Sequence, residues 1–287
     1  MKLKTPMMIC AAALMAGCAS VRKPACDTLI SHRGESVDAP ENTLPAYRTA
    51  VSRGFGFECD IYLSADKRLF TFHDNNLKRT TAGAHAEKCT EASWADTVSK
   101  VNVGGWGKWK GSAFDPTRPA LLEEVLALAR DGRKIYVEVK GNSPEWAPYI
   151  RDVFARQTTA TPENVRFITF GDKIAKALKE TMPEYKLYFL LSSHKGHKSA
   201  KGGKQPDAWT ADEVLAKLRE TQADGVDIRF DPAVHDAAFV SRIKDEGYEF
   251  HVWTVDSLGL ALKAFAAGAD TVTTNCAKKL LDEYEGK

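Results

Sequence analysis

The sequence lacks long hydrophobic runs, internal repeats and any polar linker that would divide residues 26–284. Its longest N-terminal apolar run, from Met7 to Met15, is too short to cross a bilayer as a stable helix, because a span needs about 20 residues. Proline and glycine are near their average use, which excludes collagen-like and disordered classes. The length of 287 residues therefore suits one large folded domain or two small ones.

An excess of one charge is also missing. The chain has 40 basic and 38 acidic residues, and removing residues 1–17 takes away Lys2 and Lys4 but no acid, which leaves 38 of each. No global positive field then favours nucleic acid or an anionic membrane surface. We expect no nucleic-acid partner, and any anion binding must be local.

Cysteine spacings typical of zinc sites are absent, although there are six cysteines. Cys10 lies in the apolar N-terminal run, and four cysteines lie beyond residue 25: Cys26, Cys59, Cys89 and Cys276. In an oxidising compartment these four would allow one or two disulfides, with three full pairings open. We interpret them as structural.

The N-terminus has the pattern of a secretory signal, with two lysines, an apolar run and small residues before Cys18. The segment LMAGC resembles a bacterial lipobox, in which Cys18 would become the lipidated first residue. Met15 departs from the usual leucine, so cleavage without lipid stays open, as does a buried N-terminal helix. The prediction is a signal peptide over 1–17, a lipidated tether over 18–25, and anchoring in a bacterial cell envelope, on the periplasmic or outer-membrane face.

Short apolar runs alternate with amphipathic helical patterns through the rest of the chain. Eight such alternations over about 250 residues predict a (β/α)8 TIM barrel. An open doubly wound sheet is the alternative, but no glycine-rich phosphate loop follows the first strand. The strands are predicted at 28–32, 55–61, 133–140, 165–170, 186–191, 224–230, 248–255 and 270–275, and the helices at 42–54, 121–132, 144–157, 173–182, 211–220, 237–247 and 257–268.

One further strand, at 68–73, follows its predecessor too closely for a parallel crossover. It must therefore form an antiparallel hairpin that rises from the rim of the barrel. A turn centred near residues 66–67 would place Asp60 roughly opposite His73.

Charged residues gather at the predicted carboxyl ends of strands, where barrel enzymes have their active sites. Period-two alternation puts Glu58 and Asp60 on one strand face, and Glu138 with Lys140 on another. A purely structural ring of ion pairs is the alternative. The set predicted to converge on the barrel mouth is His32, Arg33, Glu58, Asp60, His73, Glu138 and Lys140.

Three carboxylates without a thiolate suit one hard divalent cation, Mg²⁺ or Ca²⁺. Two histidines suit general acid–base chemistry, because imidazole titrates near neutral pH. Arg33 and Lys140 suit a phosphate group. Together these residue types predict hydrolysis of a phosphodiester.

Seven motifs, in order, resemble those of the glycerophosphodiester phosphodiesterases: ISHRG (30–34), PENT (40–43), ECD (58–60), FTFHDNNLKRTTAG (70–83), LLEEVL (121–126), VEVK (137–140) and WTVD (253–256). The resemblance covers residues 28–281, within a predicted catalytic domain at 26–287. It implies a barrel enzyme that cuts glycerophosphodiesters into glycerol 3-phosphate and an alcohol with one divalent metal.

The resemblance also implies roles for individual residues. His32 and His73 match the catalytic pair, and the metal acids match Glu58, Asp60 and Glu138. Arg33 and Lys140 match residues near the phosphate. Trp253 matches a position at the mouth, where it would border the substrate or simply pack in the barrel.

Other residues have plainer predictions. Asn42 and Thr43 match a family motif but read as a helix cap. His251 is expected to be a packed, hydrogen-bonded histidine, and the lysine-rich loop 192–207 a solvated loop on the active-site face. Thr274-Asn275 stands where relatives commonly have Thr-Asp; if that acid tunes the site, the rate or leaving group would differ.

Residues 75–120 correspond to a small insertion in relatives. Its Trp94, Trp106 and Trp109 would shape the leaving-group pocket or form the insertion's own core. Two other functions remain as alternatives. One is a barrel phosphodiesterase of the phospholipase C or D kind acting on intact phospholipid, and the other is a non-catalytic lipoprotein that binds glycerophosphodiesters.

Overall fold

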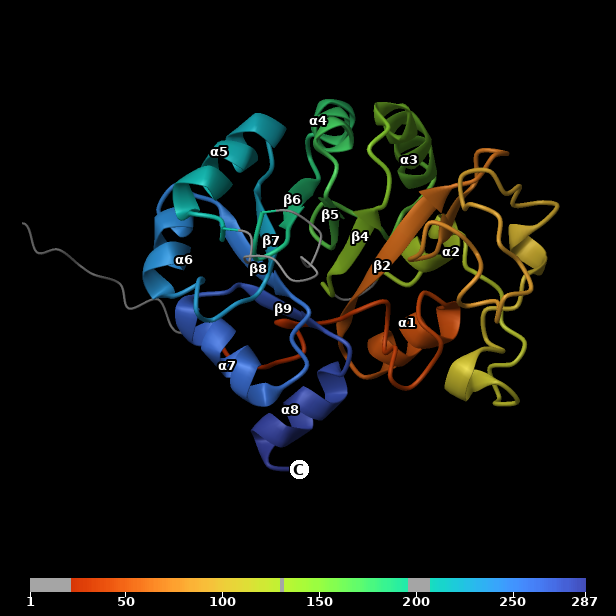
Figure 1. The fold of residues 1–287 in the computed structure, drawn as a ribbon, viewed down its shortest axis with the longest axis horizontal. Helices are drawn as coiled ribbons and strands as arrows, with labels where there is room; N and C mark the ends of the chain where they lie inside the picture. The colour runs from red at the N-terminus through yellow and green to blue at the C-terminus, as the bar shows by residue number, and fades with distance from the viewer. Residues whose placement is uncertain (1–21, 130–131, 196–206) are drawn as a thin grey trace, which may run out of the picture.

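Eight parallel strands form the centre of the structure, a computed structural model that describes residues 22–129, 132–195 and 207–287 (Figure 1). The strands are β1 (Leu29–Ser31), β2 (Gly56–Leu63), β4 (Ile135–Val139), β5 (Val165–Thr169), β6 (Lys186–Leu191), β7 (Gly225–Arg229), β8 (Glu249–Trp253) and β9 (Thr271–Thr274). Each lies within a stretch that the apolar pattern predicts, or within two residues of it.

Strand β1 closes the sheet into a barrel because it pairs on both sides. Its Ile30 lies opposite Gly56 of β2 and opposite Thr273 of β9, and both pairings are parallel. The remaining strands follow in the order β9, β8, β7, β6, β5, β4, β2. The predicted TIM barrel is confirmed, and the open-sheet alternative is wrong.

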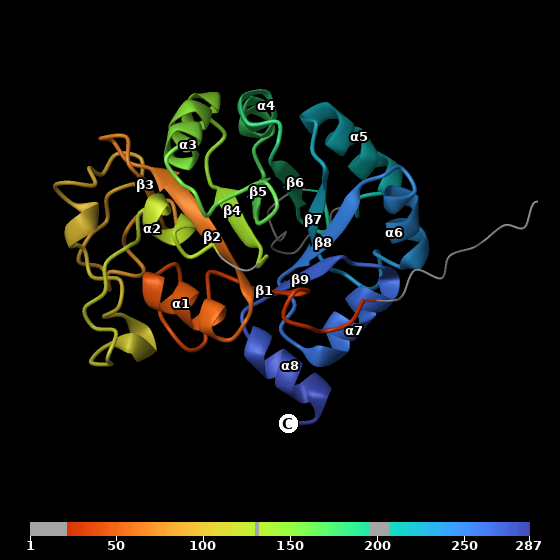
Figure 2. The ribbon, with the colours of Figure 1, turned by 180° about the vertical axis from the view of Figure 1, so that it is seen from behind.

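Helices surround the barrel on its outer side (Figures 1 and 2). They are α1 (Leu44–Ser52), α2 (Leu122–Leu126), α3 (Ala147–Phe154), α4 (Asp172–Thr181), α5 (Ala211–Thr221), α6 (Ala237–Lys244), α7 (Leu258–Ala267) and α8 (Ala277–Glu285), with a one-turn 3-10 helix η3 (Pro144–Trp146) before α3. Side chains of Thr210, Asp236 and Ser257 accept hydrogen bonds from backbone N–H groups at the starts of α5, α6 and α7. The predictions missed α8 and made α2 too long.

Strand alternation divides the core into two parts. Outward residues of the strands pack against the helices, as Leu29, Cys59 and Phe167 do. Inward residues form a smaller cluster inside the barrel, and the partly buried Trp253 packs against this cluster. The inner cluster consists of Ile30, Tyr136, Ile168, Tyr188 and Leu190.

The predicted hairpin is present as β2 and the antiparallel strand β3 (Leu69–Thr71). Ile61 lies opposite Thr71, and the N–H of Phe72 donates to the carbonyl of Asp60. Asp60 is therefore opposite Phe72 and not His73, one residue from the prediction. The reason is the turn, in which the Ser64 N–H already bonds to the Arg68 carbonyl.

The segment between β3 and α2 is mostly irregular and lies beside β2 at one edge of the molecule (Figure 1). Its two single-turn helices are η1 (Val98–Lys100) and η2 (Gly107–Trp109). The carboxylate of Asp66, at the hairpin turn, accepts hydrogen bonds from the N–H groups of Trp94 and Ala95. The hairpin turn thus anchors the segment between β3 and α2.

Several predictions fall outside the described residues, including the signal peptide, Cys18 and most of loop 192–207. Among the residues that are described, no helix is long and apolar enough to cross a membrane. The four described cysteines are free thiols, so the permitted disulfides are not formed there.

Candidate active site

A cavity of about 500 Å³ opens at the carboxyl ends of the barrel strands. Its charged lining is His32, Arg33, Glu58, His73, Glu138 and Lys140, and the rest is Ile168, Phe170, Leu190, Asp227, Trp253, Thr254 and Thr273. Six of the seven residues predicted at the mouth therefore line one cavity, and the seventh, Asp60, lies beside them. This convergence is as predicted, while the role of each residue stays a prediction.

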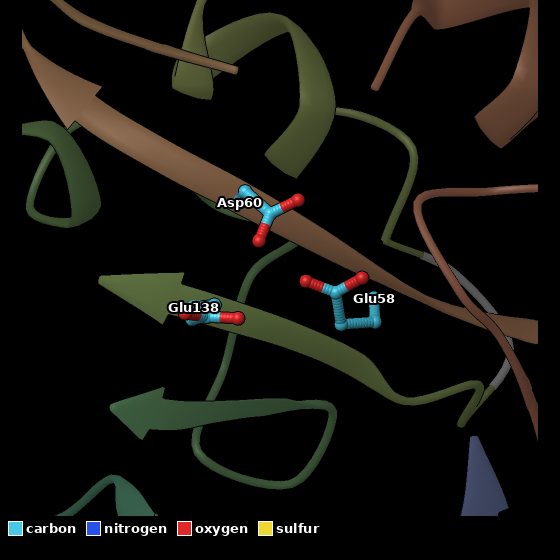
Figure 3. Close-up of side chains that lie close together, drawn as sticks. All are labelled: Glu58, Asp60 and Glu138. Atoms are coloured by element: carbon cyan, nitrogen blue, oxygen red, sulfur yellow. The ribbon is translucent and has the colours of Figure 1, made fainter. Parts of the chain in front are cut away.

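Three acids project from neighbouring strands into a common space (Figure 3). Glu58 and Asp60 come from the same face of β2, and the β2–β4 register sets Glu138 opposite Asp60. One carboxylate oxygen of each acid lies within 4.8 Å of the others, and all three side chains are buried. Such an array is favourable only if cations compensate it.

Asp60 is compensated by the protein itself. Its Oδ1 lies 3.3 Å from Lys140 Nζ and its Oδ2 lies 3.5 Å from Arg33 Nε. Burial alone would raise its pKa, but the charges of Lys140 and Arg33 outweigh burial and hold the pKa well below the usual range. Asp60 is therefore an anion in the folded protein.

Glu58 and Glu138 are less well compensated. Burial and the negative charges of Asp60 and Glu138 raise the pKa of Glu58 well above its ordinary value, and its Oε1 has no hydrogen-bond partner among the described residues. Burial also raises the pKa of Glu138 to about 7, against the effect of Lys140 at 2.8 Å.

The donor set fits a hard divalent cation. It offers carboxylate oxygens alone, the ligands that Mg²⁺ and Ca²⁺ prefer, and two of them, Glu58 Oε1 and Asp60 Oδ1, are buried without a hydrogen-bond partner among the described residues. A bound cation would offset the mutual repulsion of the acids. A purely structural ion-pair ring, the alternative from sequence, leaves Glu58 Oε1 without explanation.

His32 is held by an amide. The Nδ2 of Asn275 donates to Asp256 at 2.7 Å, so Oδ1 of the same amide faces His32 Nδ1, also at 2.7 Å. Because that oxygen can only accept, neutral His32 carries its proton on Nδ1 and a lone pair on Nε2. Burial, and then the charge of Arg33, lowers the pKa of His32 to about 4.

His73 is held by a carboxylate instead. Its Nδ1 lies 2.8 Å from Asp74, which accepts two hydrogen bonds from Arg79, at 2.7 and 3.0 Å. Arg79 also donates twice to Glu41, and Glu41 accepts from Arg33 at 2.8 Å. A continuous chain of charges therefore joins the second histidine to Arg33.

The predicted helix cap holds by position, because Thr43 is the N-cap residue of α1, but its side chain does not cap the helix. Thr43 makes no side-chain cap hydrogen bond, and its hydroxyl donates to the Pro40 carbonyl. Asn42 adopts a left-handed backbone conformation, φ 56°, and its Nδ2 donates to Asp60 at 2.7 Å. Its Oδ1 accepts from the N–H of Asp60 and from Tyr47. Asn42 thus positions the buried acid rather than the helix.

Sequence reasoning missed the partners of the histidines and the role of Asn42. Glu41 and Arg79 lie inside the motifs PENT and HDNNLKRTT, so the motifs contained the signal, but the pairing appears only in three dimensions. Asn275 was noticed only as a departure from relatives. It contacts His32 directly, with Asp256 behind it.

The remaining wall of the cavity is mainly apolar. Trp253 borders it, with its Nε1 donating to the backbone carbonyl of Asp227 at 3.0 Å and its ring edge-on to Phe170. His251 is fully buried, stacks on Tyr188 and bonds to Thr271, which confirms its packing role.

The three tryptophans of segment 75–120 are outside the described lining of this cavity. Trp94 is buried against Phe70, Trp109 packs on Phe114, and Trp106 lies under the guanidinium of Arg79. Trp94 therefore belongs to the hydrophobic core, while the half-buried Trp106 and Trp109 pack within the segment.

Comparison with known proteins supports the same reading. Residues 32–279 match the model of the Glycerophosphoryl diester phosphodiesterase family. Mouse glycerophosphodiester phosphodiesterase 1 is 32% identical over 126 residues, 44% of this chain and 37% of its own length. A Bacillus subtilis protein provisionally named a glycerophosphodiester phosphodiesterase is 24% identical over 86% of this chain and 93% of its own length.

A solved structure has the same fold. A phosphodiesterase from Oleispira antarctica, in complex with its product sn-glycerol-3-phosphate, superposes with a TM-score of 0.73 at 25% identity, covering 90% of this chain and 96% of its own. Because the family model spans most of the chain and the site residues gather in one cavity, the chain belongs to the glycerophosphoryl diester phosphodiesterase family of enzymes.

Proposed function

We propose that the chain hydrolyses glycerophosphodiesters to glycerol 3-phosphate and an alcohol, with one Mg²⁺ or Ca²⁺ held by Glu58, Asp60 and Glu138. The observation that carries the proposal is one cavity lined by Glu58, Glu138, two histidines and two cations, with Asp60 grouped beside the two acids. The family match and the product bound to the Oleispira relative support this substrate class.

Arg33 and Lys140 would hold the phosphate group. Both side chains line the cavity while ion pairs fix them in place, Arg33 to Glu41 and Lys140 to Glu138. A cation that is already positioned needs no reorganisation when charge develops on the phosphate oxygens. When bound, the metal would supply further Lewis-acid stabilisation of that charge.

The histidines would divide the proton transfers according to their partners. His32, with its proton fixed on Nδ1 by Asn275, has its Nε2 lone pair available to accept a proton from water or from the neighbouring glycerol hydroxyl. His73, whose Nδ1 faces the Asp74 carboxylate, is better suited to carry a positive charge and to protonate the departing alkoxide. The P–O bond to the alcohol breaks as that proton is delivered.

An assay of the full chain tests the reaction. Glycerophosphocholine is supplied, and glycerol 3-phosphate is followed with a coupled dehydrogenase, before and after EDTA and after Mg²⁺ or Ca²⁺ is returned. We expect activity that EDTA abolishes and one cation restores. Binding of glycerophosphocholine without turnover would favour the binding lipoprotein, and faster hydrolysis of phosphatidylcholine vesicles would favour the phospholipase alternative.

Leaving-group chemistry tests the division between the histidines. A p-nitrophenyl phosphodiester needs no protonation of its leaving group, because p-nitrophenolate is a weak base. We expect His73→Ala to lose about 100-fold or more on glycerophosphocholine but much less on the p-nitrophenyl ester, while His32→Ala loses on both. The reverse pattern would exchange the two roles.

The envelope location remains a separate proposal. The lipobox-like segment supports lipidation at Cys18 after removal of residues 1–17. Expression in a bacterium supplied with labelled palmitate, followed by fractionation, tests this. Label and membrane association should be lost in Cys18→Ser, and an unlabelled protein in the soluble fraction would contradict the anchor.

A further inference from the structure

Two buried polar groups on the side of the cavity away from the acids and histidines have no hydrogen-bond partner among the described residues. Asp227 of β7 is 1% exposed and Thr273 of β9 is 2% exposed, and both line the cavity. Within the described residues, Asp227 Oδ1 and Thr273 Oγ1 make no hydrogen bond. Neither group has a part in the acid–base or metal chemistry proposed above.

Leaving such groups unpaired is unfavourable. A buried polar atom that loses its water and gains no partner destabilises a fold. No cation among the described residues lowers the pKa of Asp227, and burial together with the charge of Glu138 raises the pKa of its carboxyl group well above the ordinary value. Valine or leucine at these positions would serve packing alone better.

Their placement within the cavity is specific. The register sets Asp227 opposite Leu190 of β6. Thr273 lies opposite Ile30 of β1, and Ile30 precedes His32 by two residues. The two polar groups therefore occupy the otherwise apolar wall, which includes Ile168, Phe170 and Trp253, and Thr273 is at its catalytic side.

We propose that Asp227 and Thr273 form a hydroxyl-binding subsite for the vicinal diol of the glycerol moiety. The carboxyl oxygen accepts a hydrogen bond from one hydroxyl, and the threonine hydroxyl exchanges a hydrogen bond with the substrate. This assignment rests on the proposed function, and it names the polyol end of the substrate as the part that the β7–β9 wall recognises. Esters without the diol would leave both groups unpaired and bind less well.

The test compares phosphodiesters with and without the diol. Thr273→Val and Asp227→Leu remove the polar atoms at similar size. We measure kcat/KM on glycerophosphocholine and the inhibition constant of propylphosphocholine, which lacks both hydroxyls. We expect each variant to lose about 10- to 100-fold in kcat/KM on glycerophosphocholine and less than about 3-fold in affinity for propylphosphocholine. Asp227→Asn, which keeps an acceptor oxygen, should retain most of the discrimination.

A matched control lies on the same strand. Thr271 is also buried, but its hydroxyl bonds to His251 and Tyr136 and it does not line the cavity. Thr271→Val should lower the melting temperature without changing the preference for the diol. Thr273→Val should do the opposite, keeping or raising the melting temperature, because it removes an unpaired hydroxyl.

Binding separates failure of the subsite from failure of the proposed reaction. Calorimetry on the full chain compares glycerol 3-phosphate with propyl phosphate. If no phosphodiester is hydrolysed but glycerol 3-phosphate binds better, and Thr273→Val removes the difference, the subsite stands and the proposed reaction falls. Equal losses on both phosphodiesters, or an unchanged preference in Thr273→Val and Asp227→Leu, would overturn the subsite.

Discussion

The two sides of the cavity differ in the charge of their side chains and in how those side chains are paired. Strands β1, β2 and β4, with the hairpin, carry every charged group of the site except Asp227, whereas β5 to β9 present aromatic and aliphatic side chains. On the charged side each cation is paired with an acid, as Lys140 is with Glu138 and Arg33 with Glu41. On the other side, Oδ1 of the buried Asp227 has no hydrogen-bond partner among the described residues.

This difference teaches that the cations of the charged side are held in place before any ligand arrives, while Glu58 Oε1 and the polar groups of the apolar side are left for a ligand. Paired charges hold one another in place and make electrostatic stabilisation available without rearrangement. Buried polar groups that the protein leaves unpaired on an apolar wall find their partners in a bound molecule or in ordered water. Changes on the two sides should therefore affect different quantities.

The largest effect is expected for Asp60→Asn. This change leaves Lys140 and Arg33 without their shared anion in a buried position, so the free energy of unfolding should fall by about 3 kcal/mol. Hydrolysis of glycerophosphocholine should fall at least about 100-fold as well. Urea unfolding in EDTA and the coupled assay measure the two effects.

Glu58→Gln is the matched comparison two residues away. It should lose activity to the same degree but keep or raise the stability in EDTA, because the raised pKa of Glu58 shows that its charge is unfavourable there. It should also lose any stabilisation that added Mg²⁺ or Ca²⁺ gives the parent chain. If Asp60→Asn and Glu58→Gln lower the free energy of unfolding in EDTA equally, the protein does not compensate the charge of Asp60 better than that of Glu58.

Arg79→Ala tests whether the chain of charges positions the catalytic groups. Loss of the guanidinium frees both Asp74 and Glu41, so kcat should fall about 10- to 100-fold with little change in KM. Added guanidinium should restore part of kcat, because the site is 39% exposed and the cation alone carries the donors. Rescue of this kind is not expected for a residue that only stabilises the fold.

Arg118 supplies the control for that experiment. Like Arg79, it makes two hydrogen bonds to a carboxylate, that of Glu124, and lies over a tryptophan, Trp94. Unlike Arg79, it makes no hydrogen bond or ion pair with the acid that holds His73. Arg118→Ala should leave kcat within about 2-fold, since exposed pairs contribute little beyond local stability. A similar loss in both variants would mean that the segment acts on kcat only through its folding.

Sequence reasoning reached the barrel and the charged side because both follow from local patterns. Alternation along β2 fixes which way Glu58 and Asp60 point, and strand ends fix where they meet. It failed where contacts join distant segments: Asn42 reads as a cap until its amide is seen on Asp60. Asp227 lies in an ordinary apolar strand pattern, and only its missing partner makes it notable.

Phe170→Ala addresses the apolar side and should have a smaller effect. The ring is 41% exposed and lies edge-on to Trp253, so its loss removes modest contact area from a bound substrate. KM for glycerophosphocholine should rise about 3- to 10-fold while kcat changes little, because apolar contact is alike in the ground and transition states. A fall in kcat with unchanged KM would place this ring among the groups that act in the transition state.

The smallest effect on activity is expected at His235, which lies beyond β7 and outside the cavity. It is 1% exposed, its Nδ1 accepts from the N–H of Asp231 at 3.0 Å, and Phe239 and Phe250 pack around it. Burial lowers the pKa of His235 from 6.5 to about 4, although Asp231 opposes this. The neutral form is therefore the one that the fold accommodates.

The sign of the pH dependence follows from that lowered pKa. Above pH 6.5 the histidine is neutral in both states, and as the pH falls the unfolded chain binds a proton before the folded chain does. Relative to His235→Gln, the parent should lose about 3 kcal/mol of unfolding free energy between pH 7 and pH 4, at 1.36 kcal/mol per pKa unit. Urea unfolding at several pH values measures this. Turnover of the variant at pH 7 should stay near that of the parent, because the proposed chemistry depends on the opposite side of the barrel mouth.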